Sequence, residues 1–253
     1  MVWFRVSANV SMGHLSRVAN EIFRELEDAF ARNDLSLVPM WAGPLAVLVG
    51  VARGDVTLAE HNFSRARAAW FSSEVTVQDL CLQEGGWYLH VHAGRFREAL
   101  QSAVAWHARL KRSAMSRSRW FMSEARLAVG LAAAALAGQT PSAAERRALL
   151  RQADRFARAD GDYQSLVRAA LACQRGDRSG AIAALRETPP PSHGRLHLLA
   201  ARRRLGVLLG DAEGASLIRE CDDYMRAGGA VDPERLAATL LPGMELPELR
   251  RRA

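Results

Sequence analysis

Four of the seven histidines stand in pairs with the spacing of metal ligands. His90 and His92 are two residues apart, and His193 and His197 are four apart, which places the second pair on one face of a helix. No glutamate lies between His193 and His197 as it does in zinc proteases, and no nearby cysteine or carboxylate completes a ligand set at local spacing. We therefore predict structural or exposed histidines, with no metal and no cofactor. Stoichiometric zinc in the purified protein would contradict this prediction.

The residues that commonly act as nucleophiles or acid catalysts do not form a catalytic motif in this sequence. Cys81, Cys173 and Cys221 are odd in number and far apart, and they fall in apolar helical stretches where burial makes a thiol inert. No Gly-x-Ser-x-Gly motif occurs. The neighbouring carboxylates Asp222 and Asp223 fall at helix positions where we expect solvation. We predict no catalytic residue and a protein that is not an enzyme.

The densest basic stretch is the one place where residue types suggest an anionic partner. Basic side chains beside an aromatic residue can bind phosphates and stack on bases. This stretch falls in a loop between helices, where solvated charge is ordinary, and no recognition helix or RNA-binding motif accompanies it. We expect that nucleic acid is not the ligand and retain, as candidate contacts to an anionic partner, Arg109, Lys111, Arg112, Arg117 and Arg119, which precede Trp120.

Composition describes a folded chain with no obvious membrane span. With 253 residues, 49% of them hydrophobic, the chain can bury a substantial core. The longest apolar runs, residues 41–52 and 127–138, are shorter than the ~18 to 20 residues that a membrane-spanning helix needs. The N-terminal residues lack the basic head of a signal peptide, so we expect a cytoplasmic protein that does not associate with membranes. Lys111 is the only lysine among 34 basic residues, so the net charge of +7 reflects coding bias more than ligand binding.

Apolar residues recur with helical spacing wherever a pattern is clear. Between Leu15 and Phe30 they fall on one stripe of a helix, and those between Phe96 and Leu110 form a second stripe. No segment alternates with the period of a strand. Five tryptophans lie inside such helical runs, and we predict that most of these five pack in the core: Trp41, Trp70, Trp87, Trp106 and Trp120.

Glycines punctuate the helical segments at a nearly regular interval. Counting from Gly13, they fall at residues 13, 54, 94, 138, 176 and 210, at intervals of 41, 40, 44, 38 and 34 residues. A glycine in the left-handed conformation commonly ends a helix, and a polar residue caps the next one. A period of one helix pair is typical of solenoids, in which each pair must stack on its neighbours.

We therefore predict an all-α fold, a right-handed α-α superhelix that forms an elongated, curved solenoid of about 12 to 13 helices. Residues 1–253 form one helical-repeat domain. The three prolines at 189–191 mark either a tight turn or a hinge that divides the chain into residues 1–188 and 192–253. The predicted helices span residues 1–12, 14–32, 38–53, 56–72, 76–93, 95–113, 116–138, 142–160, 162–175, 178–187, 193–209, 212–227 and 233–241.

Two of the helix junctions resemble the tetratricopeptide (TPR) repeat. Residues 92–100 (HAGRFREAL) are the best copy, and residues 175–181 (RGDRSGA) are a weaker one. In this pattern a glycine permits the tight turn, an aromatic residue fills the gap between the helices, and small residues allow close approach.

The C-terminal stretch resembles a more particular family. The segments 201–206 (ARRRLG), 209–214 (LGDAEG), 224–229 (YMRAGG) and 232–236 (DPERL), followed by Leu241-Pro242-Gly243, are similar to the closing part of large myxobacterial-type serine/threonine protein kinases. In that family a kinase domain precedes a long helical-repeat tail. The resemblance covers most of the chain, with its sharp motifs in about the last fifty residues. This chain departs from the family in having no kinase or ATPase region and in carrying an arginine-rich extension at 247–253.

Kinase chemistry itself has no counterpart in these residues. The chain has no glycine-rich loop followed by a strand lysine, no His-Arg-Asp and no Asp-Phe-Gly. The resemblance therefore implies a non-catalytic regulatory module that acts in signalling and binds a protein or peptide, such as a kinase or another signalling protein. The alternative is an effector-binding or nucleic-acid-linked module of a transcriptional regulator or signalling ATPase.

Overall fold

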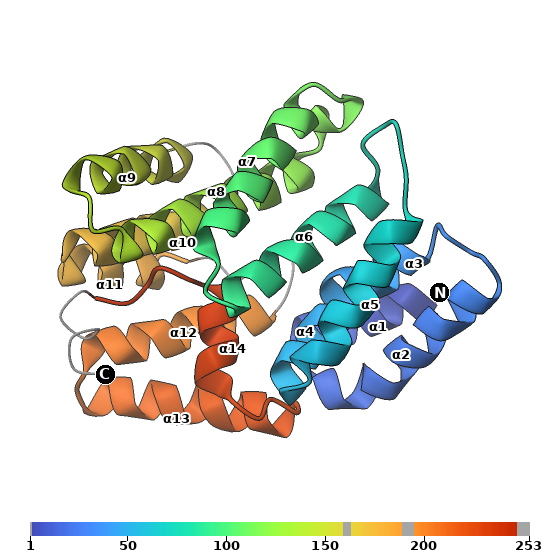
Figure 1. Cartoon of the computed structure of the whole chain (residues 1–253). Coiled ribbons are helices and arrows are strands. Elements are labelled where there is room, and N and C mark those ends of the chain that lie inside the picture. The colour runs from blue at the N-terminus through green and yellow to red at the C-terminus, as the bar shows by residue number, and fades with distance from the viewer. Residues whose placement is uncertain (1, 159–162, 189–194, 247–253) are drawn as a thin grey trace.

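The computed structural model describes residues 2–158, 163–188 and 195–246, and Figure 1 shows their course. These residues form helices and contain no strand, which confirms the all-α class for this part of the chain. The elements are α1 (Val2–Met12), α2 (Leu15–Ala31), α3 (Val38–Met40), the π-helical turn η1 (Trp41–Leu45), α4 (Ala46–Arg53), α5 (Val56–Ala69), α6 (Val77–His92), α7 (Phe96–Lys111), the 3-10 turn η2 (Ala114–Arg117), α8 (Arg119–Gln139), α9 (Ala143–Ala157), α10 (Gln164–Arg175), α11 (Arg178–Arg186), α12 (Arg195–Leu209), α13 (Ala212–Ala227) and α14 (Pro233–Leu240).

Helix junctions lie close to where the sequence predicts them, because local chemistry ends and starts each helix. At the α10–α11 junction, Gly176 takes a φ of +76°, a conformation that costs other residues a steric clash. Asp177 then caps α11 by accepting a hydrogen bond of 2.8 Å from the Gly180 amide. The same left-handed conformation is present at Gly13, Gly54, Gly94 and Gly210.

Gly138 is an exception: the predicted helix end is confirmed to within one residue, but Gly138 does not take the left-handed conformation. It lies inside α8, which continues through Gln139. The helix ends because Thr140 precedes Pro141, whose ring disfavours helical backbone in the residue before it. Thr140 accordingly has an extended backbone, with φ −86° and ψ 118°.

The predicted helix over residues 38–53 is interrupted. Gly43 has a non-helical ψ of −123° inside η1, directly before Pro44. Proline lacks an amide hydrogen and restricts the residue before it, so the chain bends here instead of continuing as one straight helix. A Cβ on Gly43 would lie only 2.5 Å from the carbonyl oxygen of Cys81, so a glycine lets η1 approach α6 closely.

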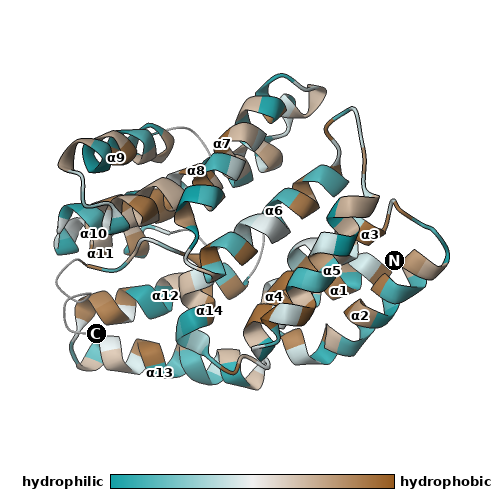
Figure 2. Ribbon diagram, in the orientation of Figure 1, coloured by the Kyte–Doolittle hydropathy of each residue, from teal (hydrophilic) through white to brown (hydrophobic). Residues whose placement is uncertain are grey.

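The main hydrophobic core runs through the bundle from Val6 to Leu246, and a smaller second cluster around Trp106, Leu110 and Phe121 joins α6, α7 and α8. α8 packs against α6, α7, α9 and α10. Among the described residues it is the one helix long and apolar enough to cross a membrane, and 72% of the relevant window is buried within the protein, as in a core helix. Figure 2 shows α4 and α8 mostly in apolar colours, whereas polar residues follow one side of α2. The core includes Trp41, Trp87 and Trp106, as predicted.

The first and last helix pairs contact each other, which an open stack of repeats does not require. α1 packs on α12, and the Ser16 amide donates a 2.8 Å hydrogen bond to the carbonyl oxygen of Gly228. The Tyr224 hydroxyl donates to the carbonyl oxygen of Met12 at 3.0 Å. Farther along, the Val231 amide donates to the carbonyl oxygen of Ala52 at 2.8 Å. These contacts join residues more than 170 positions apart, so the N-terminal and C-terminal hairpins support one another.

The C-terminal helix α14 crosses between the last hairpin and α6, as Figure 1 shows in red. Thr239 on α14 lies 3.0 Å from Nδ1 of His92 on α6. Beyond α14, the fully buried Gln174 donates from Nε2 to the carbonyl oxygens of Gly243 at 2.6 Å and Glu245 at 3.2 Å. The prolines at 189–191, where we predict a turn or a hinge, lie outside the described residues, but the flanking helices α11 and α12 contact each other.

Candidate functional site

A cleft of about 710 Å³ opens between helices that are far apart in the sequence. Residues of α1, η1, α6, α8 and α12 line it. A narrower pocket continues from it toward α7 and α14. Five residues line both spaces and so stand where they meet: Leu80, Glu84, Tyr88, Glu124 and His197. These residues come from α6, α8 and α12, so the packing of these three helices brings the set together.

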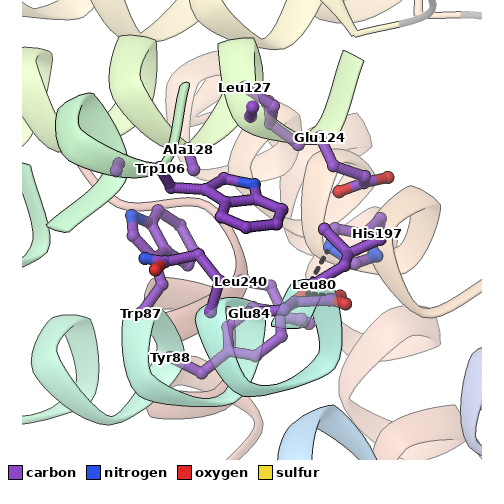
Figure 3. Close-up of a pocket in the computed structure, with 13 residues that line it drawn as sticks. Leu80, Glu84, Trp87, Tyr88, Trp106, Glu124, Leu127, Ala128, His197 and Leu240 are labelled. Carbon is purple, nitrogen blue, oxygen red and sulfur yellow. Dashed lines mark hydrogen bonds between the residues drawn. The ribbon is translucent and has the colours of Figure 1, made fainter. Parts of the chain in front are cut away.

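Polar side chains from three helices meet at this junction, as Figure 3 shows. Glu84 and Tyr88 are four residues apart on α6, a spacing that places them on one helix face. The Tyr88 hydroxyl donates to Oε1 of Glu84 at 3.4 Å and lies 3.3 Å from Nε2 of His197 on α12. Glu124 enters from α8. The cleft therefore contains two carboxylates among apolar residues, and Arg195, His197 and two serines line it as well.

The surroundings change the protonation of Glu84. Burial disfavours its charged form, and the nearby charge of Glu124 adds to this effect, so the pKa of Glu84 is raised to about 8. The hydrogen bond from Tyr88 acts in the opposite direction and is the smallest of the three influences. Burial and the same carboxylates also raise the pKa of Tyr88, which remains a phenol. At neutral pH Glu84 is mostly a neutral carboxylic acid that can donate a hydrogen bond.

Aromatic rings form the walls of the narrower pocket. Trp87 and Trp106 are both 5% exposed, and their indole nitrogens have no hydrogen-bond partner among the described residues. In Figure 3 the Trp106 ring extends across the pocket, with its nitrogen edge turned toward the side where Glu124 enters. The indole nitrogens of Trp41 and Trp70 are likewise buried without a partner among the described residues, so this feature does not by itself mark a binding site.

A test of the protonation state follows from the raised pKa of Glu84. The folded protein holds this proton between the ordinary carboxyl pKa of 4.5 and about 8, while the unfolded chain releases it. Stability is therefore lost as the pH rises through this window. We expect Glu84→Gln to be more stable than the wild type by about 1 to 2 kcal/mol near pH 9 and equal to it near pH 4.5. This expected difference in stability is smaller than the full shift of the Glu84 pKa implies, because the Glu84 side chain is only partly buried and solvent screens its charge. Thermal melts across the pH range measure the difference, and a constant difference would contradict the assignment.

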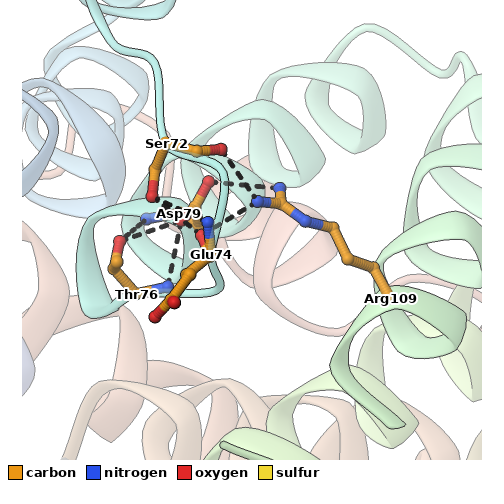
Figure 4. A network of polar contacts seen from close by, with 5 residues as sticks. All are labelled: Ser72, Glu74, Thr76, Asp79 and Arg109. Carbon is orange, nitrogen blue, oxygen red and sulfur yellow. Dashed lines mark hydrogen bonds and ion pairs between the residues drawn. The ribbon is translucent and has the colours of Figure 1, made fainter. Parts of the chain in front are cut away.

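The five basic residues that we predict as contacts to an anionic partner do not all face solvent for such a partner, because Arg109 is engaged within the protein. Arg109 donates from Nη1 to Oδ1 of Asp79 at 3.2 Å and from Nη2 to the carbonyl oxygens of Glu74 at 3.0 Å and Ser72 at 3.4 Å. Asp79 also accepts from the Thr76 amide and hydroxyl at the start of α6 (Figure 4). Arg109 therefore connects α7 to the loop before α6. The exposed members are Lys111, Arg112, Arg117 and Arg119, around the η2 turn.

This network gives a matched pair of variants. Arg109→Met removes the cation that faces the buried Asp79 carboxylate, and we expect it to lower the free energy of unfolding by about 1 to 2 kcal/mol. Arg112→Met changes an exposed side chain three residues away and is expected to stay within about 0.5 kcal/mol of the wild type. Urea unfolding measures both. Equal effects would show that the Arg109 network contributes nothing particular to stability.

Most of the histidines and cysteines singled out in the sequence lie within the packed helices, and His197 and Cys81 line the cleft. His92 contacts Thr239, and burial lowers the pKa of both His90 and His92. No group of three metal-binding side chains is present among the described residues, and His193 lies outside them. The three cysteines are buried and free, as predicted. Burial raises the pKa of Cys221 to about 11 and that of Cys81 still further.

The expected solvation of Asp222 is wrong. Asp222 is 8% exposed, and its Oδ1 accepts a 2.7 Å hydrogen bond from Nε of Arg203, which is 6% exposed. Asp223 next to it is exposed, as predicted. The reason is the packing of α13 on α12, which covers the Asp222 face of the helix. Arg204 is buried as well, so the basic run 202–204 is mainly an interior feature.

Sequence reasoning missed the two carboxylates of the cleft. Glu84 lies in the middle of α6, and Glu124 lies in the first turns of α8, without any motif around either residue. The sequence held only a weak signal for these two residues. Each is a single acidic residue in a helix whose other residues are mostly buried. Their proximity depends on the packing of α6, α8 and α12, which local spacing does not encode.

Comparisons of the chain with family models, with curated proteins and with solved structures gave no significant match. The kinase-tail resemblance therefore stays a prediction from the residues quoted for it.

Proposed function

We propose that this chain is a non-catalytic helical-repeat module that binds a protein or peptide partner in the cleft between α1, η1, α6, α8 and α12. The observation that carries the proposal is the cleft itself, whose walls come from distant parts of the chain and whose volume of about 710 Å³ is in the range of ligand-binding sites. In this proposal the hairpins follow the right-handed order of a TPR-like superhelix, with the two ends in contact.

Aromatic side chains near the mouth of the cleft support binding of a partner. Phe4 on α1 is 74% exposed and Trp120 on α8 is 36% exposed, and both line the cleft. Large exposed aromatic residues beside a concave surface are frequent anchors in protein interfaces. A preformed cleft of this kind binds with little ordering cost.

The setting we propose is bacterial signalling in the cytoplasm, with a serine/threonine kinase or a related signalling protein as partner. Support for this setting comes from the C-terminal segments quoted above, including residues 224–229 and 232–236. In the structure these residues belong to the end of α13 and the start of α14, which join the last hairpin to the rest of the bundle.

A small-molecule effector is the second candidate ligand. The favouring observation is the volume of the cleft, about 710 Å³, which suits a small organic molecule, whereas the narrow pocket behind it, at about 30 Å³, has room for little more than water. Binding of nucleic acid is not supported by the basic stretch, because Arg109 is engaged within the protein. A salt-dependent shift of a DNA or RNA fragment at physiological salt would contradict that view.

The test is affinity capture from a native lysate with a matched control. The wild type, a Phe4→Ser/Trp120→Ser variant and a Phe71→Ser variant are compared by mass spectrometry. Phe71 is 89% exposed and lies outside the cleft lining, so its variant controls for nonspecific loss of apolar surface. We expect a specific protein to be recovered with the wild type and Phe71→Ser and to be lost with the double variant. Equal recovery with all three, or a retained small molecule without a protein, would contradict the proposed function.

A further inference from the structure

We infer that one end of the helical bundle binds the surface of a phospholipid bilayer that carries anionic headgroups. The contacts at this end are the exposed ring of Phe71 and three exposed cations, Lys111, Arg112 and Arg117. The inference goes beyond the proposed function, because none of these four residues lines the cleft.

Two loops meet at this end, the loop between α5 and α6 and the connection from α7 through η2 to α8. Figure 1 shows both of them extending beyond the helices that they join. Arg109 connects them, since its guanidinium donates to the carbonyl oxygens of Ser72 at 3.4 Å and Glu74 at 3.0 Å. Val75 from the first loop and Met115 from the second pack against the same hydrophobic cluster, the second one described above. The two loops therefore form one continuous surface.

Positive charge at this end is not neutralised within the protein. Lys111 and Arg112 lie at the end of α7 and Arg117 at the end of η2. All three are exposed, and none of them makes an ion pair within the described residues. Glu74 is the one acidic residue in the two loops. A cation close to an anionic membrane strengthens binding by about fivefold, so the three together supply about a hundredfold.

Phe71 supplies an apolar contact beside these cations. Its side chain is 89% exposed, the largest exposed fraction among the large hydrophobic residues of the described chain. It directly precedes Ser72, whose carbonyl oxygen accepts from Arg109, one helical turn before Arg112. The ring is in water in the free protein and leaves water when it enters the headgroup region of a bilayer, which strengthens binding.

The shape of this end favours a bilayer over a protein partner. Phe71 and the cations stand on loops that project from the bundle, away from the cleft. A projecting surface offers no groove to a peptide. A bilayer is soft and nearly flat, and it receives single aromatic side chains among the headgroups while basic side chains remain at the phosphates.

The inference revises the expectation that the chain does not associate with membranes. That expectation rested on the lack of a long apolar run and of a signal peptide. Binding at a bilayer surface requires neither, because it depends on the buried apolar area and on attraction to anionic lipids. We therefore expect a reversible attachment that salt weakens.

The experiment measures binding of the full chain to lipid vesicles by co-sedimentation. One set of vesicles contains phosphatidylcholine and phosphatidylglycerol in a ratio of about two to one, and the other contains phosphatidylcholine alone. We expect the wild type to bind the mixed vesicles at least about tenfold more tightly than the neutral ones. Raising the salt concentration to about 1 M should remove most of this difference.

Variants assign the binding to residues. Lys111→Gln/Arg112→Gln/Arg117→Gln is expected to weaken binding to the mixed vesicles by at least about tenfold. Phe71→Ser should weaken it by about tenfold, because the ring no longer contributes its transfer from water, and Phe71→Trp should bind as tightly as the wild type. All four positions are exposed, so thermal melts should match those of the wild type.

A triple variant at the other end of the bundle controls for net charge. Arg17, Arg53 and Arg235 are exposed and make no ion pair within the described residues. Arg53 and Phe71 stand at opposite ends of α5, whose 14 residues span about 20 Å. Arg17→Gln/Arg53→Gln/Arg235→Gln removes the same charge but should bind within about threefold of the wild type, because salt screens charges that lie farther than about 8 Å from the lipid.

The outcomes are distinct for each part of the inference. No preference of the wild type for the mixed vesicles overturns it, and so does an equal loss in the two triple variants, which would indicate attraction by net charge alone. If the loop triple variant loses binding but Phe71→Ser does not, the cations contact an acidic protein or a nucleic acid, and the bilayer assignment is wrong. Phe71→Ser also separates this inference from the proposed function, since it should lose the vesicles and retain the captured protein.

Discussion

Replacing Asp222 with alanine is expected to lower the free energy of unfolding by about 3 to 5 kcal/mol. Asp222 and Arg203 face each other across the α12–α13 hairpin at 2.7 Å, and both are nearly excluded from solvent. Loss of the carboxylate leaves the Arg203 guanidinium buried, with the exposed Glu234 at 3.6 Å as its remaining carboxylate contact. A buried charge that loses its partner keeps the cost of its desolvation and loses the attraction that offset it.

Two matched variants decide whether burial of the pair is the cause. Asp223→Ala removes the neighbouring carboxylate, which is exposed, and should change stability by no more than about 0.5 kcal/mol. The double variant Arg203→Met/Asp222→Leu replaces both charges with apolar groups and should recover most of the stability lost in Asp222→Ala. Urea unfolding of the four proteins measures this. If Asp222→Ala and Asp223→Ala behave alike, the buried pair does not contribute as we infer.

Helix positions were predictable because the signals for them are local. The stripe from Leu15 to Phe30 became α2, and left-handed glycines ended the helices at five of the six predicted glycine positions. Gly138 shows the limit of that rule, because it remains helical next to the end of α8. A glycine permits a helix to end but does not require it, and Pro141 determined where α8 stopped.

The contact between the two ends of the chain was not predictable from spacing. The sequence around Gly13 and around Gly228 indicates only ordinary turns, and nothing in it predicts that the two glycines contact each other. The same holds for the cleft, whose carboxylates come from α6 and α8. Asp222 looked solvated for a related reason, since its burial depends on the neighbouring helix and not on its own sequence. Tertiary packing, which single-sequence patterns do not encode, decided all three.

Gly228→Val is expected to destabilise the protein by about 3 kcal/mol or more, because it separates the two ends of the chain. A Cβ at this position would lie 1.9 Å from the carbonyl oxygen of Gly13, which belongs to the backbone and cannot move aside as a flexible side chain can. The φ of Gly228 is −77°, so the backbone itself tolerates valine, and the expected loss comes from the clash alone.

Two measurements on Gly228→Val distinguish separation of the chain ends from a general loss of stability: the change in the free energy of unfolding, and the positions where hydrogen exchange accelerates. Ala227→Val alters the exposed residue just before Gly228 and should change stability by no more than about 0.5 kcal/mol. In Gly228→Val, hydrogen exchange should accelerate first at the Ser16 amide, which donates to the Gly228 carbonyl oxygen at 2.8 Å, and across α1. Because α1 forms one wall of the cleft, the same variant should also weaken partner binding through Phe4. A Gly228→Val protein with wild-type stability and unchanged exchange at Ser16 would show that this contact does not hold the ends together.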